Sequence, residues 1–175
     1  LSNNQNVFIG SGSGNANTSG SKNTAIGNSS LNKNQTATNN VAIGYRALTN
    51  NVALYNTALG SWSLQANTSG WQNTAMGYNA LHDNISGSYN TASGSISLQK
   101  NTTGNYNTAN GQAALYSNTT GSHNTASGAY SLNKNTDGAY NTAMGDSSLF
   151  ANVGGTNNAA IGPKSLASNT NSPVK

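Results

Sequence analysis

The amino-acid sequence predicts an all-β fold, a parallel β-solenoid of about ten 17-residue rungs with two short strands in each rung. A motif of the form Asn-Thr-Ala-x-Gly returns along the whole chain, and every copy keeps the glycine at its fifth place. The spacing is 17 residues throughout, except for one step of 16 between the third and fourth copies. A fixed short period over many copies is typical of solenoids. The ten copies start at Asn6, Asn23, Asn40, Asn56, Asn73, Asn90, Asn107, Asn124, Asn141 and Asn158.

The composition argues against both an ordinary globular core and a disordered chain. Only 34% of the 175 residues are hydrophobic, against roughly 45–50% in globular domains, so the core must be thin. Disordered chains are usually highly charged, whereas charged residues make up 6% of this chain and its apolar residues recur regularly. We expect one repeat domain over residues 1–175, in which 169–175 form a C-terminal exit segment.

The length of the repeat selects among the known repeat folds. Seventeen residues are too few for a pair of helices, which needs roughly 33, and for a leucine-rich repeat, which needs about 20–29. They suffice for two short strands and two turns. The period therefore favours a β-solenoid.

The first strand of each rung is expected at the motif itself, at positions 0 to 4 when its first Asn is position 0. In the sixth copy, alternation puts Ala92 on the inward face and Thr91 and Ser93 on the outward face. Asn90 and Gly94 share the face of Ala92. Narrow inward residues let the walls of the solenoid approach closely, and the invariant glycine indicates a turn or a close backbone approach.

The second strand is expected around positions 7 and 8, which are Ser97 and Leu98 in the sixth copy. The Asn-Thr-x-Gly segment that follows, 101–104, has turn chemistry. The 16-residue copy lacks one residue of this turn, within 49–55, where a deletion disturbs the stack least. Asn recurs at positions 0 and 11, and stacked Asn side chains are expected to form amide ladders from rung to rung.

Position 3 changes character along the chain. It is apolar in the first five copies and the last two, but polar at Ser93, Asn110 and Ser127. An exposed apolar stripe favours association with another surface, and self-association with cyclic symmetry is the economical solution. The candidate subunit-interface residues are Ile9, Ile26, Ile43, Leu59, Met76, Met144 and Ile161.

Three segments resemble known repeats. The phrases NVAIGYRAL (40–48), NTAIGNSSL (23–31) and NTAMGYNAL (73–81) are similar to the head repeats of trimeric autotransporter adhesins. They resemble more closely the NTAIGYxAL repeats of tail-fibre-like proteins of phages and bacterial surfaces. The resemblance covers essentially residues 6–168.

The resemblance implies a parallel β-roll with three chains side by side, at an extracellular, cell or virion surface. Pairs such as Val41 with Ile43 would then meet neighbouring subunits. The autotransporter repeat is shorter, however, and the polar residues at position 3 of the middle copies depart from its pattern. Two-chain, single-chain and filamentous packings therefore stay open.

Residue types with catalytic potential are few and scattered. Asp83, Asp137 and Asp146 lie at unrelated positions of the repeat, and the chain has no Glu, which argues against a paired-carboxylate site. His82 and His123 are more than two rungs apart. There is no phosphate-binding loop, no Cys and no Asp-containing calcium turn. We expect no enzyme, metal or cofactor.

The remaining sequence patterns argue against two kinds of partner. The net charge of +4 is spread thinly along the chain, without the basic stripe that neutralises phosphates. No apolar run approaches the roughly 20 residues of a membrane span. We expect neither nucleic-acid binding nor membrane insertion.

Aromatic residues recur just before the motif. A ladder of rings along one edge could stack on sugars while neighbouring amides bond to hydroxyls, or it could shield the sheet and contact a neighbouring chain. Both interpretations stay open. The candidate glycan-binding or lateral-contact residues are Tyr55, Tyr89, Tyr106, Tyr140 and Trp71.

Asn-x-Ser/Thr sequons recur at position 11. In a glycosylating host such turns would be accessible acceptors, although Asn and Thr also suit the turn itself. The candidate glycosylation sites are Asn17, Asn34, Asn67, Asn84, Asn101 and Asn118.

These patterns favour a structural function. The chain is expected to form the shaft or head of an extracellular, cell-surface or virion-surface fibre, as a homotrimer that provides an adhesive surface. One alternative is a filament subunit that stacks end to end, because both ends of the chain are repeat-like up to the final SPVK (172–175). Another is a carbohydrate-binding module that uses the Tyr, Asn and Thr surface.

Overall fold

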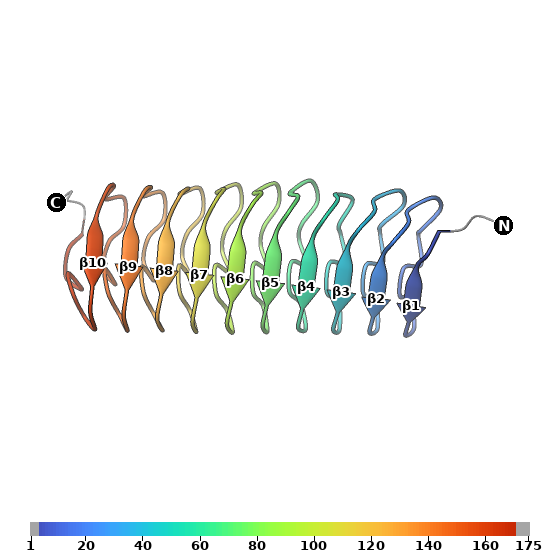
Figure 1. The fold of residues 1–175 in the computed structure, drawn as a ribbon, viewed down its shortest axis with the longest axis horizontal. Helices are drawn as coiled ribbons and strands as arrows, with labels where there is room; N and C mark the ends of the chain where they lie inside the picture. The colour runs from blue at the N-terminus through green and yellow to red at the C-terminus, as the bar shows by residue number, and fades with distance from the viewer. Residues whose placement is uncertain (1–3, 171–175) are drawn as a thin grey trace.

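The computed structural model describes residues 4–170 as a rod with a single ten-stranded parallel sheet along one side (Figure 1). The predicted all-β parallel solenoid is therefore confirmed. Residues 171–175, most of the expected exit segment, lie outside the described residues. The strands are β1 (Val7–Ile9), β2 (Thr24–Ile26), β3 (Val41–Ile43), β4 (Thr57–Leu59), β5 (Thr74–Met76), β6 (Thr91–Ser93), β7 (Thr108–Asn110), β8 (Thr125–Ser127), β9 (Thr142–Met144) and β10 (Ala159–Ile161).

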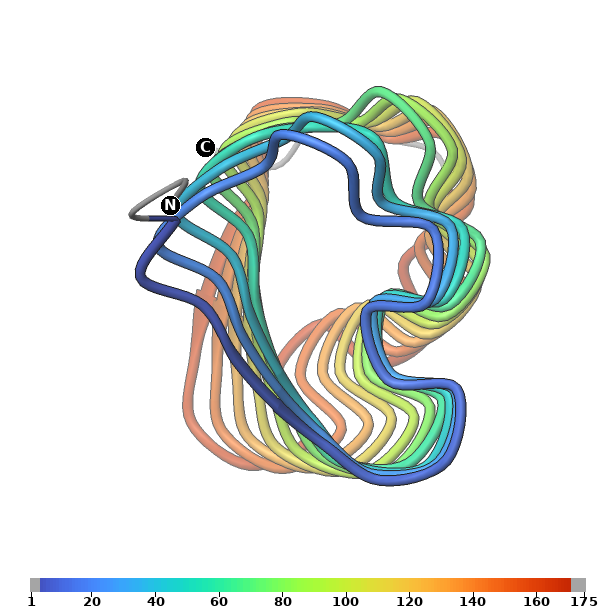
Figure 2. The same cartoon turned by 90° about the vertical axis from the view of Figure 1, so that its right-hand side faces the viewer.

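Each strand pairs with the next in the register of the repeat. Thr91 lies beside Thr108 and Ala92 beside Ala109, so equivalent residues form columns along the rod. Ten strands at roughly 4.8 Å spacing give a sheet about 43 Å long. Viewed down the axis, successive rungs nearly superimpose and drift gradually, which keeps each column continuous (Figure 2).

The expected second strand is absent from every rung within residues 4–170. Positions 6 and 8 of every rung have left-handed backbone, for example Ile96 at φ 53° and Leu98 at φ 50°, and alternating left-handed residues cannot form an extended strand. The segment still bonds to the next rung, because the Leu98 amide donates to the carbonyl of Ala114 at 2.9 Å. Two strands per rung was therefore wrong, and the first strand is shorter than expected, covering positions 1 to 3.

The core consists mainly of two narrow columns inside the rod, the Ala of position 2 and the Leu of position 8, with Ala47, Ala80 and Ala114 of position 7 packed against them. Ala92 and Leu98 are fully inaccessible to solvent, whereas Leu166 in the last rung is 37% exposed. The first rung departs from both columns, with Phe8 in place of Ala and Gly14 in place of Leu. A Cβ on Gly14 would lie 2.6 Å from the Phe8 ring. The larger residue at one position therefore occupies the space left by the smaller residue at the other.

Buried asparagines form the expected amide ladders. At position 11, Asn101 Nδ2 donates to Oδ1 of Asn84 at 2.8 Å and to the carbonyl of Gly104 at 3.0 Å. At position 0, the backbone amide of Asn107 donates to Oδ1 of Asn90 at 2.9 Å. These bonds give the buried amides the partners that burial requires.

The glycine of position 4 permits a close approach between rungs. Gly94 has φ 138°, which L-residues rarely adopt, and a Cβ there would lie 2.6 Å from the carbonyl carbon and oxygen of Gly111. From Gly10 to Gly145 the column must therefore be glycine for two independent reasons.

The third rung, 40–55, has 16 residues because its turn lacks one residue, as expected, and it interrupts the Asn ladder of position 11. Asn51 Nδ2 donates to the carbonyl of Ala53 at 2.7 Å rather than to the preceding rung. Oδ1 of Asn34 is consequently buried without a hydrogen-bond partner. The junction between the second and third rungs therefore differs from the others.

Candidate interaction surfaces

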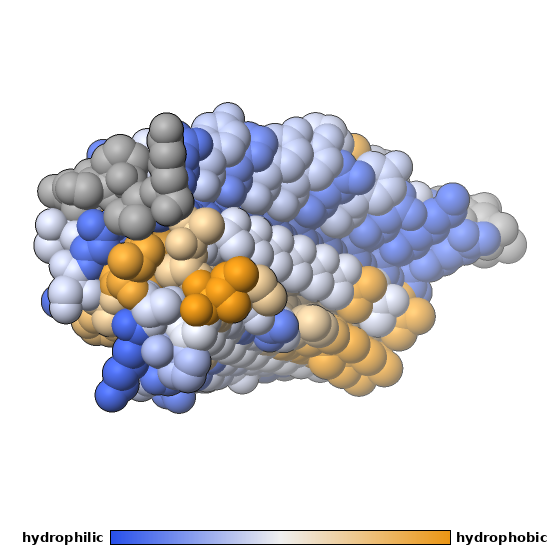
Figure 3. Space-filling model, turned by 60° about the vertical axis from the view of Figure 1, so that its left-hand side comes forward, coloured by the Kyte–Doolittle hydropathy of each residue, from blue (hydrophilic) through white to orange (hydrophobic). Residues whose placement is uncertain are grey.

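The strand face, defined as the side chains of positions 1 and 3, points away from the core along the whole sheet. Ile9 and Ile161 at its two ends are 57% and 76% exposed. Orange apolar surface appears toward both ends of the rod, with paler surface between (Figure 3). All seven candidate interface residues lie on this face: Ile9, Ile43, Met76, Met144 and Ile161 are exposed, and Ile26 and Leu59 are half-buried. Whether the face forms an interface stays a prediction.

The centre of the strand face is polar. Ser93, Asn110 and Ser127 occupy position 3 of β6, β7 and β8. Within residues 4–170 their side chains form no hydrogen bond with other protein groups, unlike the buried Asn ladders. Their donors and acceptors are therefore free for solvent or for another molecule.

The strand face carries no charge among the described residues. Lys33, Lys100 and Lys134 lie at position 10, where they project from the turns. Lys100 and Lys134 place their ammonium groups 5.0 and 5.2 Å from the ring centroids of Tyr116 and Phe150 in the following rungs. These cation–π contacts hold two of the lysines against the turns, outside the strand face.

A ladder of stacked rings, here called the ring ladder, runs along one edge of the rod. Trp71 meets Tyr89 edge to face, with centroids 4.8 Å apart. The next three pairs, Tyr89–Tyr106, Tyr106–His123 and His123–Tyr140, are nearly parallel at 4.7, 4.9 and 4.8 Å. The predicted column of rings just before the motif is confirmed for Tyr89, Tyr106 and Tyr140, whereas Trp71, one residue earlier in its rung, was not predicted to join it. Tyr55, in the 16-residue rung, has no ring contact within residues 4–170 and does not join it.

The stacking restricts how the ring ladder could recognise a sugar. Tyr106 and His123 have both ring faces covered by the neighbouring rings. The expected mode, a ring face against a sugar, is therefore blocked at the centre of the ladder. Ring edges remain, together with the last ring, Tyr140, which is 59% exposed.

A second aromatic group was not predicted. Tyr45, Trp62 and Tyr78 pack edge to face with centroids 5.6 and 5.5 Å apart. They occupy positions 5, 6 and 5 of consecutive rungs, so no single column of the sequence indicates that they meet.

The sequons are less accessible than the sequence suggested. Asn34, Asn67, Asn84, Asn101 and Asn118 are fully buried, and their Nδ2 atoms donate within the position-11 ladder. The expectation of accessible acceptors was wrong for these five residues, because their side chains turn inward and hold the rungs together. Asn17, in the first rung, is half-buried and donates to the carbonyl of Gly20 at 3.1 Å.

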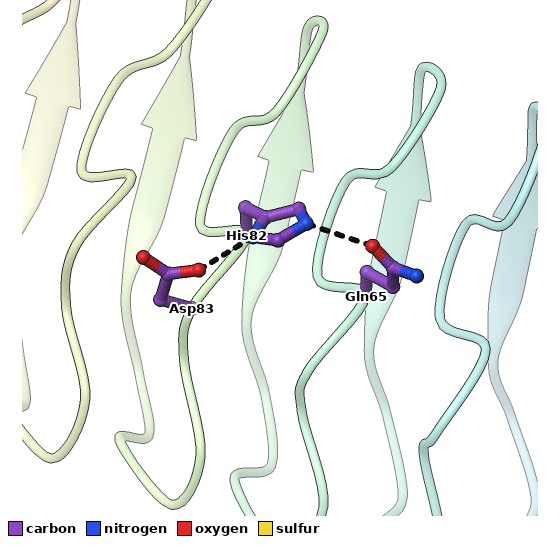
Figure 4. Close-up of polar contacts among 3 residues, drawn as sticks. All are labelled: Gln65, His82 and Asp83. Atoms are coloured by element: carbon purple, nitrogen blue, oxygen red, sulfur yellow. Dashed lines mark hydrogen bonds and ion pairs between the residues drawn. The ribbon is translucent and has the colours of Figure 1, made fainter.

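The contact between His82 and Asp83 does not build a larger site. His82 Nδ1 lies 2.5 Å from Oδ1 of Asp83, and Nε2 lies 2.7 Å from Oε1 of Gln65 in the preceding rung (Figure 4). No group of three His, Cys, Asp or Glu side chains comes together in the described part of the chain. Residues 4–170 also form no pocket, and they contain no helix that could cross a membrane.

Comparisons of the chain with protein-family models, curated proteins and solved structures find no match.

Proposed function

We propose that this chain is a structural repeat domain of a fibre on an extracellular, cell or virion surface, where it displays or provides an adhesive surface. The observation that carries the proposal is the strand face, which forms an exposed, uncharged and partly apolar strip along one side of a long rod. Exposed apolar patches of this kind mark interaction sites. The partner is taken to be the chain itself, because identical rods present strips with the same spacing.

The assembly proposed is a homotrimer with three rods side by side. The resemblance of segments 23–31, 40–48 and 73–81 to trimeric fibre repeats supports that number of chains. Closed cyclic symmetry would cover the strip on every copy at once.

The test is the mass of the assembly in solution. Sedimentation equilibrium over micromolar concentrations should give three times the mass of one chain. Ile43→Asn with Met144→Asn should shift the equilibrium toward monomer, because both changes place polar groups in the strip. The matched control, Val52→Asn with Val153→Asn, removes two exposed apolar side chains from turns and should leave the mass unchanged. A wild-type chain that stays monomeric throughout would overturn the proposal.

An end-to-end filament is the second candidate. Strands β1 and β10 are each paired on one side only within residues 4–170, and open strand edges pair readily with other strands. Electron microscopy separates the two assemblies, because lateral trimers give short rods of uniform length and end-to-end stacking gives long threads.

A carbohydrate-binding module is the third candidate. It would have to use ring edges, the exposed Tyr140 and the adjacent amides, since the central ring faces are covered. A glycan array without hits would remove it.

A further inference from the structure

We infer that the three polar rungs at the centre of the strand face fix the relative direction of the associated chains, so that copies pack parallel with the same rungs facing each other. The residues are Ser93, Asn110 and Ser127. This inference rests on the proposed self-association through the strand face. It assigns these residues a role that the apolar part of the face cannot fill.

The order of apolar and polar rungs is compatible with itself in one direction only. Position 3 is apolar in β1 to β5, polar in β6 to β8 and apolar again in β9 and β10. Two copies that run parallel and in register place apolar against apolar and polar against polar at position 3 of every rung. If one copy is reversed, Leu59 faces Asn110, and six of the ten rungs pair a polar with an apolar residue at position 3. Position 1 is Thr in seven of the ten strands and adds little to this choice of direction.

Free hydrogen-bonding groups make the mismatch costly. The side chains of Ser93, Asn110 and Ser127 have no hydrogen-bonding partner within residues 4–170, so a partner chain must supply one when it excludes water. In the parallel arrangement each meets its own copy at the same height, where hydroxyl and amide groups can bond to each other. Each buried polar group left without a partner weakens association roughly tenfold. A single buried polar position specifies coiled-coil register in the same way.

Charge does not oppose this arrangement. The strand face is uncharged over residues 4–170, although the chain as a whole carries a net charge of +4. A second copy can therefore cover the face without burying an unpaired charge or placing lysines against each other. The face matches another copy of itself in charge as well as in polarity.

Because the repeat is regular, some residues must differ between rungs if associated copies are to align in one register. Because every rung has nearly the same backbone, copies displaced by one rung would otherwise fit almost as well as aligned copies. A one-rung displacement pairs Met76 with Ser93 and Ser127 with Met144, which gives two mismatched rungs. The three polar residues Ser93, Asn110 and Ser127, here called the polar block, therefore discriminate strongly against reversed packing and less strongly against displacement by one rung.

Distances between spin labels test the direction of packing. The chain has no Cys, so Thr18→Cys labels the first rung and Thr136→Cys labels the eighth, both in turns outside the strand face. Parallel copies should give similar, narrow inter-chain distance distributions at both sites. Reversed copies would separate the labels along the axis by roughly 43 Å for the first site and roughly 24 Å for the second.

Replacing the polar block tests its role. The triple variant Ser93→Ile, Asn110→Ile, Ser127→Ile should still associate, but its distance distributions should broaden to include displaced and reversed pairs. The control Ser93→Thr, Asn110→Thr, Ser127→Thr keeps a hydroxyl in each rung and should keep the narrow distributions.

The outcomes separate this inference from the proposal on which it rests. A monomeric wild-type chain would overturn both. A wild-type assembly with reversed-packing distances, or an Ile variant with distributions as narrow as wild type, would overturn the inference and leave the fibre proposal standing.

Discussion

Left-handed backbone at residues other than glycine is the most unusual local feature of this chain. In the sixth rung, Ile96, Leu98 and Tyr106 have φ values of 53°, 50° and 56°. Each such residue costs about 1–2 kcal/mol relative to right-handed backbone. The conformation is retained because the surrounding rungs determine it: Leu98 fills the core and Tyr106 joins the ring ladder. The strained left-handed residues are therefore tolerated because the neighbouring rungs pack against them.

Ile96→Asn should increase the free energy of unfolding by about 1 kcal/mol. A β-branched side chain is poorly suited to φ 53°, whereas Asn adopts left-handed backbone readily. The neighbouring rungs carry Asn79 and Ala113 at this position, so the change fits the column. Urea denaturation followed by circular dichroism measures the effect.

Ile85→Asn is the control for this change, because Ile85 is an exposed turn residue without left-handed backbone. Its replacement should leave stability within about 0.5 kcal/mol of wild type. Equal effects at the two sites would show that backbone strain is not the cause.

A rung consists of one three-residue strand and a long bonded turn, and the junctions between rungs are not all equal. In a typical junction, the amides of Thr68 and Ser69 donate to the carbonyl of Ile85 at 3.0 and 3.1 Å. At the second junction, the amides of Gln35 and Thr36 make no such bond to the shortened rung within the described chain. Together with the unpaired Oδ1 of Asn34, this makes the second junction the weakest.

Inserting one Thr between Val52 and Ala53 should strengthen that junction. The insertion restores the usual six-residue step from the ladder Asn to the next motif, here from Asn51 to Asn56, so that Asn51 can take the ladder geometry of the other rungs and donate to Oδ1 of Asn34. It should therefore stabilise the chain by about 1–2 kcal/mol. Hydrogen exchange should slow in residues 31–38. The matched control is a Thr inserted between Thr102 and Thr103, in a turn that already has its full length. A similar gain at both sites would contradict the account.

The sequence predicted the elements that depend on small or repeated residues. The glycine and alanine columns, the Asn ladders and the site of the deletion all follow from stacking identical units. The missing second strand could not be predicted, because nothing in the Ser-Leu pair indicates that Leu98 has left-handed backbone. The buried sequons show a related limit: turn chemistry placed Asn101 in the turn but did not give the direction of its side chain.

The sequence also predicted the candidate surfaces only in part. Alternation along a short strand placed Ile9 and Ile161 on one outward face, as observed. The position of the tyrosines predicted a column of rings but not that their faces would cover each other. The Tyr45 group brings together residues from different positions of the repeat, and only the folded turn shows that they meet.

The molecule as a whole is one-dimensional, because strands contact only the strands of adjacent rungs. Stability in such a fold comes mainly from the sum of neighbouring interfaces. Removing one whole rung should therefore be tolerated better than damaging one interface.

Deletion of residues 90–106 should leave a folded rod, since it joins Tyr89 to Asn107 and keeps every column in phase. Gly94→Val should lower stability by about 3 kcal/mol or more, because it adds strain at φ 138° and a clash with Gly111. Thermal melting followed by circular dichroism compares the two. Gly162→Val is the control for the clash, since φ is 112° there but a Cβ meets no atom within 4 Å, and it should lower stability less than Gly94→Val. An unfolded deletion variant beside an unchanged Gly94→Val would refute the solenoid account.

The single strand per rung has a mechanical consequence for a rod under load. A force that peels the chain from one end acts on the bonds of one rung at a time, as in unzipping. Each released rung shortens the rod by about 4.8 Å but frees 17 residues, which extend to roughly 60 Å. A rod held at both ends would lengthen in regular steps and dissipate energy at each, which would limit the peak force on its two ends.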